Sequence, residues 1–134
     1  MSAVIASTRR IELEVGGDTV TFVCRIPTGP AMSKFLSSRF RTQRNKVESR
    51  VYEARAEFFD AIIVDLENAQ FENAENQTVD LGAATVLTEA DKTKWSGLMG
   101  VPVSGWKDLI PLGWKSSVAQ WFEDSANAEE SAKN

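Results

Sequence analysis

The chain has 134 residues, of which 43% are hydrophobic and 25% charged, and these proportions fit one soluble globular domain. No apolar run approaches the roughly 20 residues of a membrane-spanning helix, and the first residues lack the basic and apolar regions of a secretory signal. The chain contains no histidine and one cysteine, Cys24, which excludes imidazole chemistry, internal disulfides and the usual structural zinc sites. We therefore expect a protein of the reducing cytoplasm that has neither a cofactor nor a bound metal.

The net charge of −4 is unevenly distributed along the chain. Residues 1–55 contain ten Lys or Arg and five Asp or Glu, whereas residues 56–134 contain five Lys or Arg and fourteen Asp or Glu. Such a division is typical of a polyanion-binding site in the basic half, or of two halves that attract each other.

Residues 9–26 predict a β-hairpin. Apolar and polar side chains alternate on both sides of Gly16-Gly17-Asp18, as strands that are covered on one face require. A two-stranded hairpin is only marginally stable in water, so we expect helices or a partner to pack on its apolar face.

Two helices are expected to follow. Residues 31–42 carry apolar side chains at helical spacing after Thr28, a suitable N-cap. From about Asn45 to about Asn68, apolar residues recur every three or four positions, and no Gly or Pro interrupts the chain. This spacing predicts one long amphipathic helix.

The C-terminal half predicts two shorter helices separated by loops. Residues 68–80 are rich in Asn and acid and predict a loop, and residues 81–86 predict a short strand or an extended segment. Thr88 and Asp91 resemble a capping box for a helix over 89–98, and Pro111 suits the first turn of a last helix.

Residues 125–134 contain no aromatic or branched side chain, so we expect a disordered acidic tail. The fold class is therefore α+β, with a single globular domain over 1–124. In it an N-terminal β-hairpin packs with a long amphipathic helix and two shorter C-terminal helices.

No catalytic motif is present. Cys24 falls on the apolar face of a predicted strand, so we interpret it as a buried small hydrophobe and not as a nucleophile. Glu57 and Asp60 share a helix face, but acids on helices normally face water, and no phosphate-binding glycine loop occurs. We expect a protein that is not an enzyme.

A basic segment is the alternative source of function. No acid lies between Asp18 and Glu48, and phosphate groups would bind to such a run, with Phe35 and Phe40 as stacking partners. The acidic net charge favours a solvated helix face instead. Nucleic-acid binding stays an alternative that would use Lys34, Arg39, Arg41, Arg44, Lys46 and Arg50.

All four tryptophans lie between Trp95 and Trp121. Trp114 and Trp121 share one face of the last predicted helix with Val118, which favours the core. Trp95 and Trp106 flank a loop rich in Gly and Pro, and tryptophan is frequent in binding hot spots. We expect one or two indoles at a groove or an oligomer seam.

The order of these segments resembles the tail assembly chaperones of long-tailed bacteriophages and prophages. Three segments within residues 9–124 carry the resemblance. They are the hairpin "RIELEVGGDTVTFVCRIP", the charged segment "VESRVYEARAEFFDAIIVDLEN" and the closing "LTEADKTKW…WKDLIPLGWKSSVAQWFED", which an acid-rich loop precedes.

The resemblance implies a chaperone without enzymatic activity, in the cytoplasm of a bacterial host. Such proteins bind the helical tape measure protein, keep it soluble until tail tube protein polymerises around it, and tend to self-associate. A protein that holds amphipathic helices needs apolar grooves with aromatic walls. The candidate partner-binding residues are Phe35, Phe40, Phe58, Phe59, Trp95 and Trp106.

Two alternatives to the chaperone stay open. One is the small nucleic-acid-binding protein that uses residues 34–55. The other is a minor structural protein of the phage tail or head that assembles into a ring.

Overall fold

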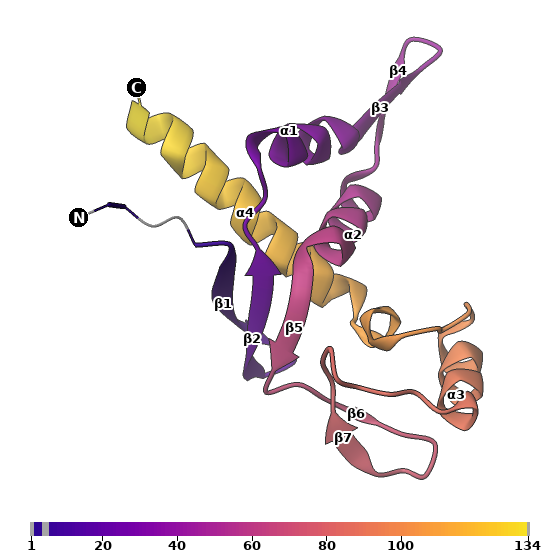
Figure 1. The fold of residues 1–134 in the computed structure, drawn as a ribbon. Coiled ribbons are helices and arrows are strands. Elements are labelled where there is room, and N and C mark those ends of the chain that lie inside the picture. The colour runs from indigo at the N-terminus through magenta and orange to yellow at the C-terminus, as the bar shows by residue number, and fades with distance from the viewer. Residues whose placement is uncertain (1, 4–5, 134) are drawn as a thin grey trace.

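The computed structural model describes the backbone of residues 2–3 and 6–133. Side chains are described for the same residues up to residue 126. Its central sheet is antiparallel and has the strand order β1 (Thr8–Val15), β2 (Asp18–Arg25), β5 (Ile63–Glu67). The helices α2 (Val51–Ile62) and α4 (Leu112–Lys133) pack on one face of this sheet (Figure 1). The predicted α+β class is confirmed.

The register of the hairpin explains why one face of the sheet is apolar. Ile11 lies opposite Phe22 and Leu13 lies opposite Val20, so these four side chains point to the same side. Phe22 is fully buried, and Cys24 beside it is also fully buried. Burial raises the pKa of the Cys24 thiol to about 12, so this side chain is a neutral core residue, as predicted.

The predicted turn between the two strands is confirmed. Gly16 and Gly17 have φ angles of 61° and 87°, in the left-handed region that favours glycine. Gly16 also lies close to α4, because a Cβ atom placed on it would sit 3.4 Å from Cζ2 of Trp114.

The predicted long helix over 45–68 is wrong. Residues Lys46–Ser49 form strand β4, α2 begins only at Val51, and Ile63–Glu67 form strand β5 of the central sheet. The spacing of Ile62, Ile63 and Leu66 is that of a helix, and a strand accommodates it only because the pairing of β5 with β2 has a register shift between Val23 and Cys24. The sheet decides between them, because Leu66 pairs with Phe22 and gives the hairpin its third strand.

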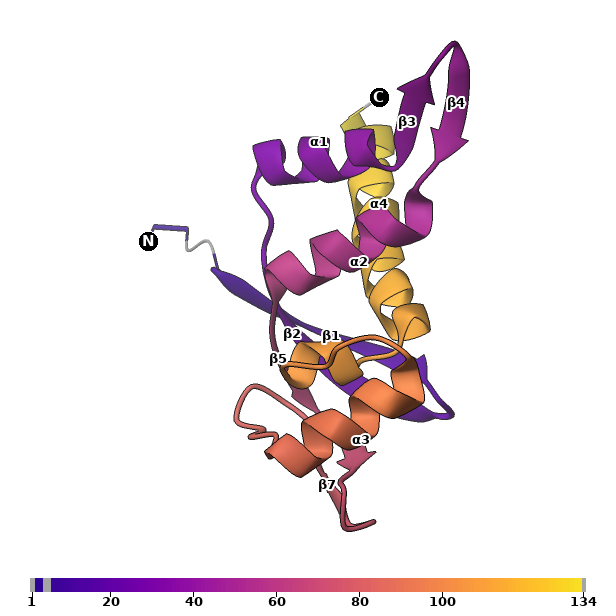
Figure 2. The ribbon, with the colours of Figure 1, turned by 90° about the vertical axis from the view of Figure 1, so that its right-hand side faces the viewer.

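The helix predicted over 31–42 is shorter and is followed by a second hairpin. Helix α1 (Gly29–Ser38) is capped by Thr28, whose Oγ1 accepts the Ala31 amide at 3.2 Å. Strands β3 (Phe40–Gln43) and β4 then pair with each other alone and project from the body (Figures 1 and 2). We call this hairpin, residues 40–49, the arm.

A third hairpin replaces part of the loop predicted over 68–80. Strands β6 (Gln70–Glu72) and β7 (Thr78–Asp80) pair with each other, whereas residues 81–86 form no strand. Helix α3 (Glu89–Met99) packs against this hairpin through Trp95, whose Nε1 donates to the Glu72 carbonyl at 3.0 Å. The predicted capping box of Thr88 and Asp91 is present.

The last helix is longer than expected. A short 3-10 helix, η1 (Trp106–Leu109), precedes α4, and α4 continues through most of the segment 125–134 for which we predict disorder. Asn134 and the side chains from residue 127 on lie outside the described residues. No helix in the described part of the chain is long and apolar enough to span a membrane.

We expect Gly17→Ala to lower the free energy of unfolding by about 1–2 kcal/mol, because an L side chain is strained at this φ. Gly97→Ala, inside α3 with open space around its Cα, should raise that free energy by about 0.5–1 kcal/mol. Urea unfolding of the two variants beside the parent chain measures both changes. Equal effects of the same sign would contradict the assigned turn.

Asp91 should make stability depend on acidity. Its Oδ1 accepts the Ala74 amide at 2.7 Å and its Oδ2 accepts the Thr88 amide at 3.1 Å. These bonds hold its pKa below the ordinary 3.8. A depressed folded pKa gives stability that is present above 3.8 and is lost as the pH falls through the folded pKa.

Asp91→Asn should therefore be less stable at neutral pH, and its unfolding free energy should fall less steeply with acid below about pH 4. Asp124→Asn, which removes an exposed carboxylate from α4, is the control. Urea unfolding measured from pH 7 down to about pH 3 compares the slopes. An unchanged slope in Asp91→Asn would contradict the role of these hydrogen bonds.

Candidate partner-binding groove

The six candidate partner-binding residues do not form one surface. Phe59 is fully buried and packs edge to face on Phe22, so it belongs to the core. Phe40 lies on the arm with 53% of its surface exposed. Trp95 and Trp106 are half-buried on α3 and η1. Only Phe35 and Phe58 lie together, and both are buried, with 4% and 7% of their surface exposed.

Each of the four indoles is half-buried against the core, and three of them contact a second element. Trp95 packs on Phe71 of β6, and Trp114 packs on Phe22 of β2. Trp121 lies beneath the guanidinium of Arg9 at 4.7 Å from the ring centroid. The indoles are therefore fixed by neighbours in the same chain, and they do not gather into one aromatic surface.

An open groove lies between α1 and α2. Phe35 of α1 and Phe58 of α2 stack face to face with their centroids 4.2 Å apart. The cavity has a volume of about 290 Å³. Small and apolar side chains provide much of its lining, and one Lys and one Glu join them: Ala31, Lys34, Phe35, Ser38, Ala54, Glu57, Phe58, Ala61 and Ile62.

The shape of this groove follows from its alanines. Ala31 and Ala61 are exposed, and Ala54 is buried below them, so no long side chain fills the space between the two helices. Lys34 and Glu57 are both exposed and carry opposite charges. A groove with small walls, an aromatic floor and charges of both signs suits one face of an amphipathic helix.

A buried ion-pair network holds the two helices of the groove on α4. Arg55 of α2 donates to both carboxylate oxygens of Glu123, at 2.9 and 3.3 Å, and to Ser116 Oγ at 3.0 Å. Arg39, at the end of α1, approaches the same carboxylate at 3.6 Å. Phe58 also packs edge to face on Phe122 of α4.

The predicted basic residues are divided among four places. Lys34 lines the groove, Arg39 joins the Glu123 network, and Arg50 pairs with Glu53 and Glu57. The three others, Arg41, Arg44 and Lys46, are exposed on the arm.

The carboxylates do not assemble a reactive site in the described residues. Asp60 pairs with Lys115 of α4 at 2.8 Å, so it does not act together with Glu57. Among the residues that the structure describes, no three acidic or cysteine side chains gather as a metal ion would require.

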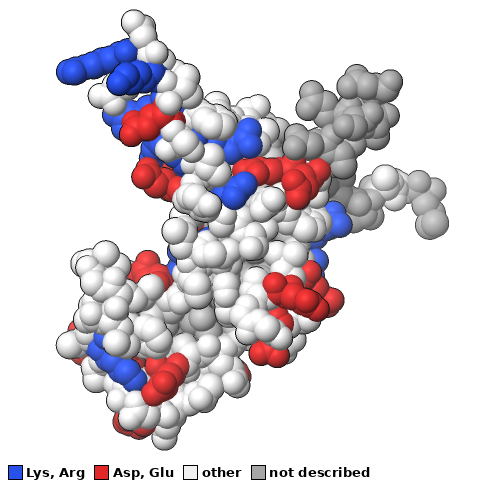
Figure 3. All heavy atoms as spheres, turned by 180° about the vertical axis from the view of Figure 1, so that it is seen from behind, with Lys and Arg blue, Asp and Glu red and all other residues white. Residues whose placement is uncertain are grey.

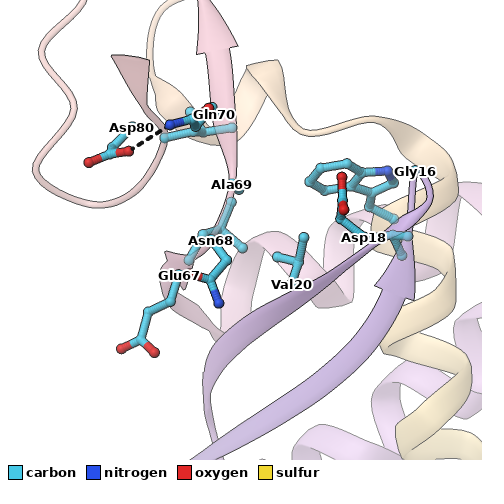
Figure 4. A pocket seen from close by; sticks show the side chains of 12 residues that line it. Gly16, Asp18, Val20, Glu67, Asn68, Ala69, Gln70 and Asp80 are labelled. Carbon is cyan, nitrogen blue, oxygen red and sulfur yellow. Dashed lines mark hydrogen bonds between the residues drawn. The ribbon is translucent and has the colours of Figure 1, made fainter. Parts of the chain in front are cut away.

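A second hollow, of about 490 Å³, lies at the other end of the sheet between the β1–β2 turn and the segment that links β5 to β6. Asp18, Glu67 and Asp80 line it from three different strands (Figure 4). The indole of Trp114 lines it as well, and so do Val15, Val20, Leu66 and Leu81. We call this hollow the acidic cleft. Its residues are scattered along the chain, so no local sequence pattern predicts it.

The Glu123 network should be essential for the groove. Glu123 is only 8% exposed in its side chain, and Glu123→Ala leaves the charge of Arg55 without its partner. We expect a loss of about 3–5 kcal/mol in unfolding free energy by urea titration. Glu57→Ala removes a carboxylate that is 69% exposed and should cost about 1 kcal/mol or less. Similar losses in the two variants would show that the network contributes little.

Comparison of the chain with protein-family models, with curated proteins and with solved structures found no match in any of the three.

Proposed function

We propose that this protein is a phage tail assembly chaperone that works without catalysis and holds a helical segment of the tape measure protein in the groove between α1 and α2. The open groove is the observation that carries the proposal, because a chaperone for amphipathic helices must offer apolar surface that its own fold leaves uncovered. Tail tube protein is a further partner that the resemblance implies. The host cytoplasm is the compartment where tail assembly would take place.

The resemblance supports this proposal through its first and last segments. The opening hairpin is β1–β2, and the closing segment comprises α3, η1 and the first half of α4. The middle segment folds as strand, helix and strand instead of one charged helix, so it no longer contributes to the resemblance.

The groove is suited to a client whose apolar side chains recur every three or four residues. Each apolar side chain of the client that leaves water in the groove contributes about 1.5–3 kcal/mol before the ordering of the client is subtracted. Two or three such contacts give the modest, reversible affinity that a temporary holder needs. Lys34 and Glu57 lie where polar residues of the client would flank this apolar contact.

Ala61→Gln tests the groove. Ala61 is exposed and its methyl group lines the groove, so the longer side chain obstructs the client without disturbing the core. We expect at least about a tenfold loss of affinity for tape measure segments, which corresponds to 1.4 kcal/mol. Ala90→Gln, at an exposed position on α3, is the matched control. Co-expression with overlapping tape measure segments, then co-elution from a sizing column, identifies the client. Titration of the purified segment then measures its affinity.

Tryptophan fluorescence distinguishes client binding in the groove from client binding at other surfaces. No tryptophan lines the groove among the described residues, so client binding there should leave the emission wavelength unchanged. A shift of the emission to the blue on binding would place the client against an indole instead. Failure of every tape measure segment to co-elute, or equal binding by Ala61→Gln and Ala90→Gln, would contradict the proposal.

A further inference from the structure

The arm is a β-ribbon that no other part of the described chain covers. All ten of its residues, 40–49, are exposed, and β3 and β4 pair only with each other. Its base is closed by the Arg50 amide, which donates to the Arg39 carbonyl at 2.7 Å. An isolated two-stranded hairpin is marginal in water, so an exposed arm of this kind is normally stabilised by a partner.

The two faces of the arm differ in chemistry. The register pairs Arg41 with Glu48 and Gln43 with Lys46, so these four side chains share one face. The opposite face carries Phe40, Thr42 and Val47, of which Val47 is 73% exposed. Arg44 occupies the tip with φ 51°. Figure 3 shows basic side chains gathered on this projecting part of the molecule.

The acidic cleft has the complementary chemistry. An arginine side chain combines an apolar stem with a planar cation that pairs with carboxylates and stacks on aromatic rings. The cleft offers each of these: the carboxylate of Asp18 beside the hollow, the carboxylate of Asp80 at its rim, the ring of Trp114, and an aliphatic lining. Glu67 already pairs with Arg10 of the same chain, whereas Asp18 and Asp80 form no ion pair among the described residues, and Asp80 accepts only a 3.4 Å hydrogen bond from the neutral Gln70 side chain.

We propose that the arm of one copy of this chain docks in the acidic cleft of a second copy, with Arg41 and Arg44 opposite Asp18 and Asp80. The arm and the cleft lie at opposite ends of the molecule, so a chain does not reach its own cleft (Figures 1 and 2). Because two different surfaces meet, the association is head to tail, and it closes into a ring or continues as a filament.

A second copy fits the charges better than a nucleic acid does. The chain has a net charge of −4, and its acidic residues are concentrated in the half that follows residue 55. The basic residues of the arm therefore meet an opposite charge on another copy, whereas a polyanion would be repelled by the rest of the molecule. The groove between α1 and α2 takes no part, so this proposal and the proposed chaperone function can fail independently.

The test is the mass in solution, by light scattering on a sizing column without any client. We expect the wild-type chain to elute with the mass of two or more copies at low salt. It should elute as one copy at about 1 M salt, where the screening length is about 3 Å. The arm variant Arg41→Gln with Arg44→Gln, and the cleft variant Asp18→Asn with Asp80→Asn, should each elute as one copy at low salt.

Mixing the two variants shows whether each is monomeric because docking is lost or because the chain has misfolded. The cleft variant keeps its arm and the arm variant keeps its cleft, so an equimolar mixture should form a pair of one chain each and nothing larger. Two charge-matched controls should assemble like the wild type: Arg25→Gln with Lys92→Gln, and Glu12→Gln with Glu89→Gln. All four positions lie outside the arm and the cleft lining.

Three results would overturn the proposal. They are a wild-type chain that is monomeric at low salt, an arm variant that still assembles, and a mixture of the two variants that stays monomeric. A monomeric wild type that binds duplex DNA, with a salt slope that falls by about 2 in the arm variant, would make the arm a nucleic-acid interface instead.

Discussion

The contacts of Phe22, in the middle strand of the sheet, determine how the helices are arranged around the sheet. Its ring meets Phe59 of α2 and Trp114 of α4, both edge to face, with centroids 6.1 and 6.3 Å away. This geometry suits the charge distribution of aromatic rings. Because a small sheet with one apolar face is not stable when it is left uncovered, this contact decides where both helices lie. The groove, the base of the arm and the acidic cleft are all built on α2, α4 or the turn beside Trp114.

The uneven distribution of charge along the sequence has a structural counterpart at Glu123. Two arginines from the basic half of the chain, Arg39 and Arg55, converge on this acid from the other half. Part of the attraction between the two halves therefore acts within one chain, where it holds α1 and α2 on α4. Three of the remaining basic residues, Arg41, Arg44 and Lys46, are on the arm, and the acids of the cleft lie at the far end of the molecule.

Local sequence patterns predicted the elements whose formation depends on residues close together in the sequence. The hairpin of residues 9–26 follows from alternation around two glycines, and the start of α3 follows from Thr88 and Asp91. The segment 45–68 could not be assigned in the same way, since the three-residue spacing of Ile63 and Leu66 is helical and fits a strand only across the irregular pairing with β2. Only pairing with β2, about 40 residues earlier, makes them a strand.

In the candidate groove, too, local patterns predict some features and tertiary contacts decide the others. Phe35 and Phe58 are predicted partner-binding residues from their type and spacing, and the structure stacks them together, buried beneath the groove. Phe59 is adjacent in sequence and has the same chemistry, yet it packs on Phe22 of the sheet and does not line the groove, because the start and rotation of α2 depend on tertiary contacts. Glu123 and Arg55 are 68 residues apart, so no local pattern connects them.

The distance along the chain between Phe22 and the helix that covers it also has a consequence for synthesis. The apolar face of the first hairpin leaves the ribosome early, but α4 contributes Val118 and Phe122 roughly a hundred residues later. At about 5–20 residues per second, this face waits about 5–20 seconds before its cover exists. During that interval the nascent chain itself exposes the kind of apolar surface that aggregates.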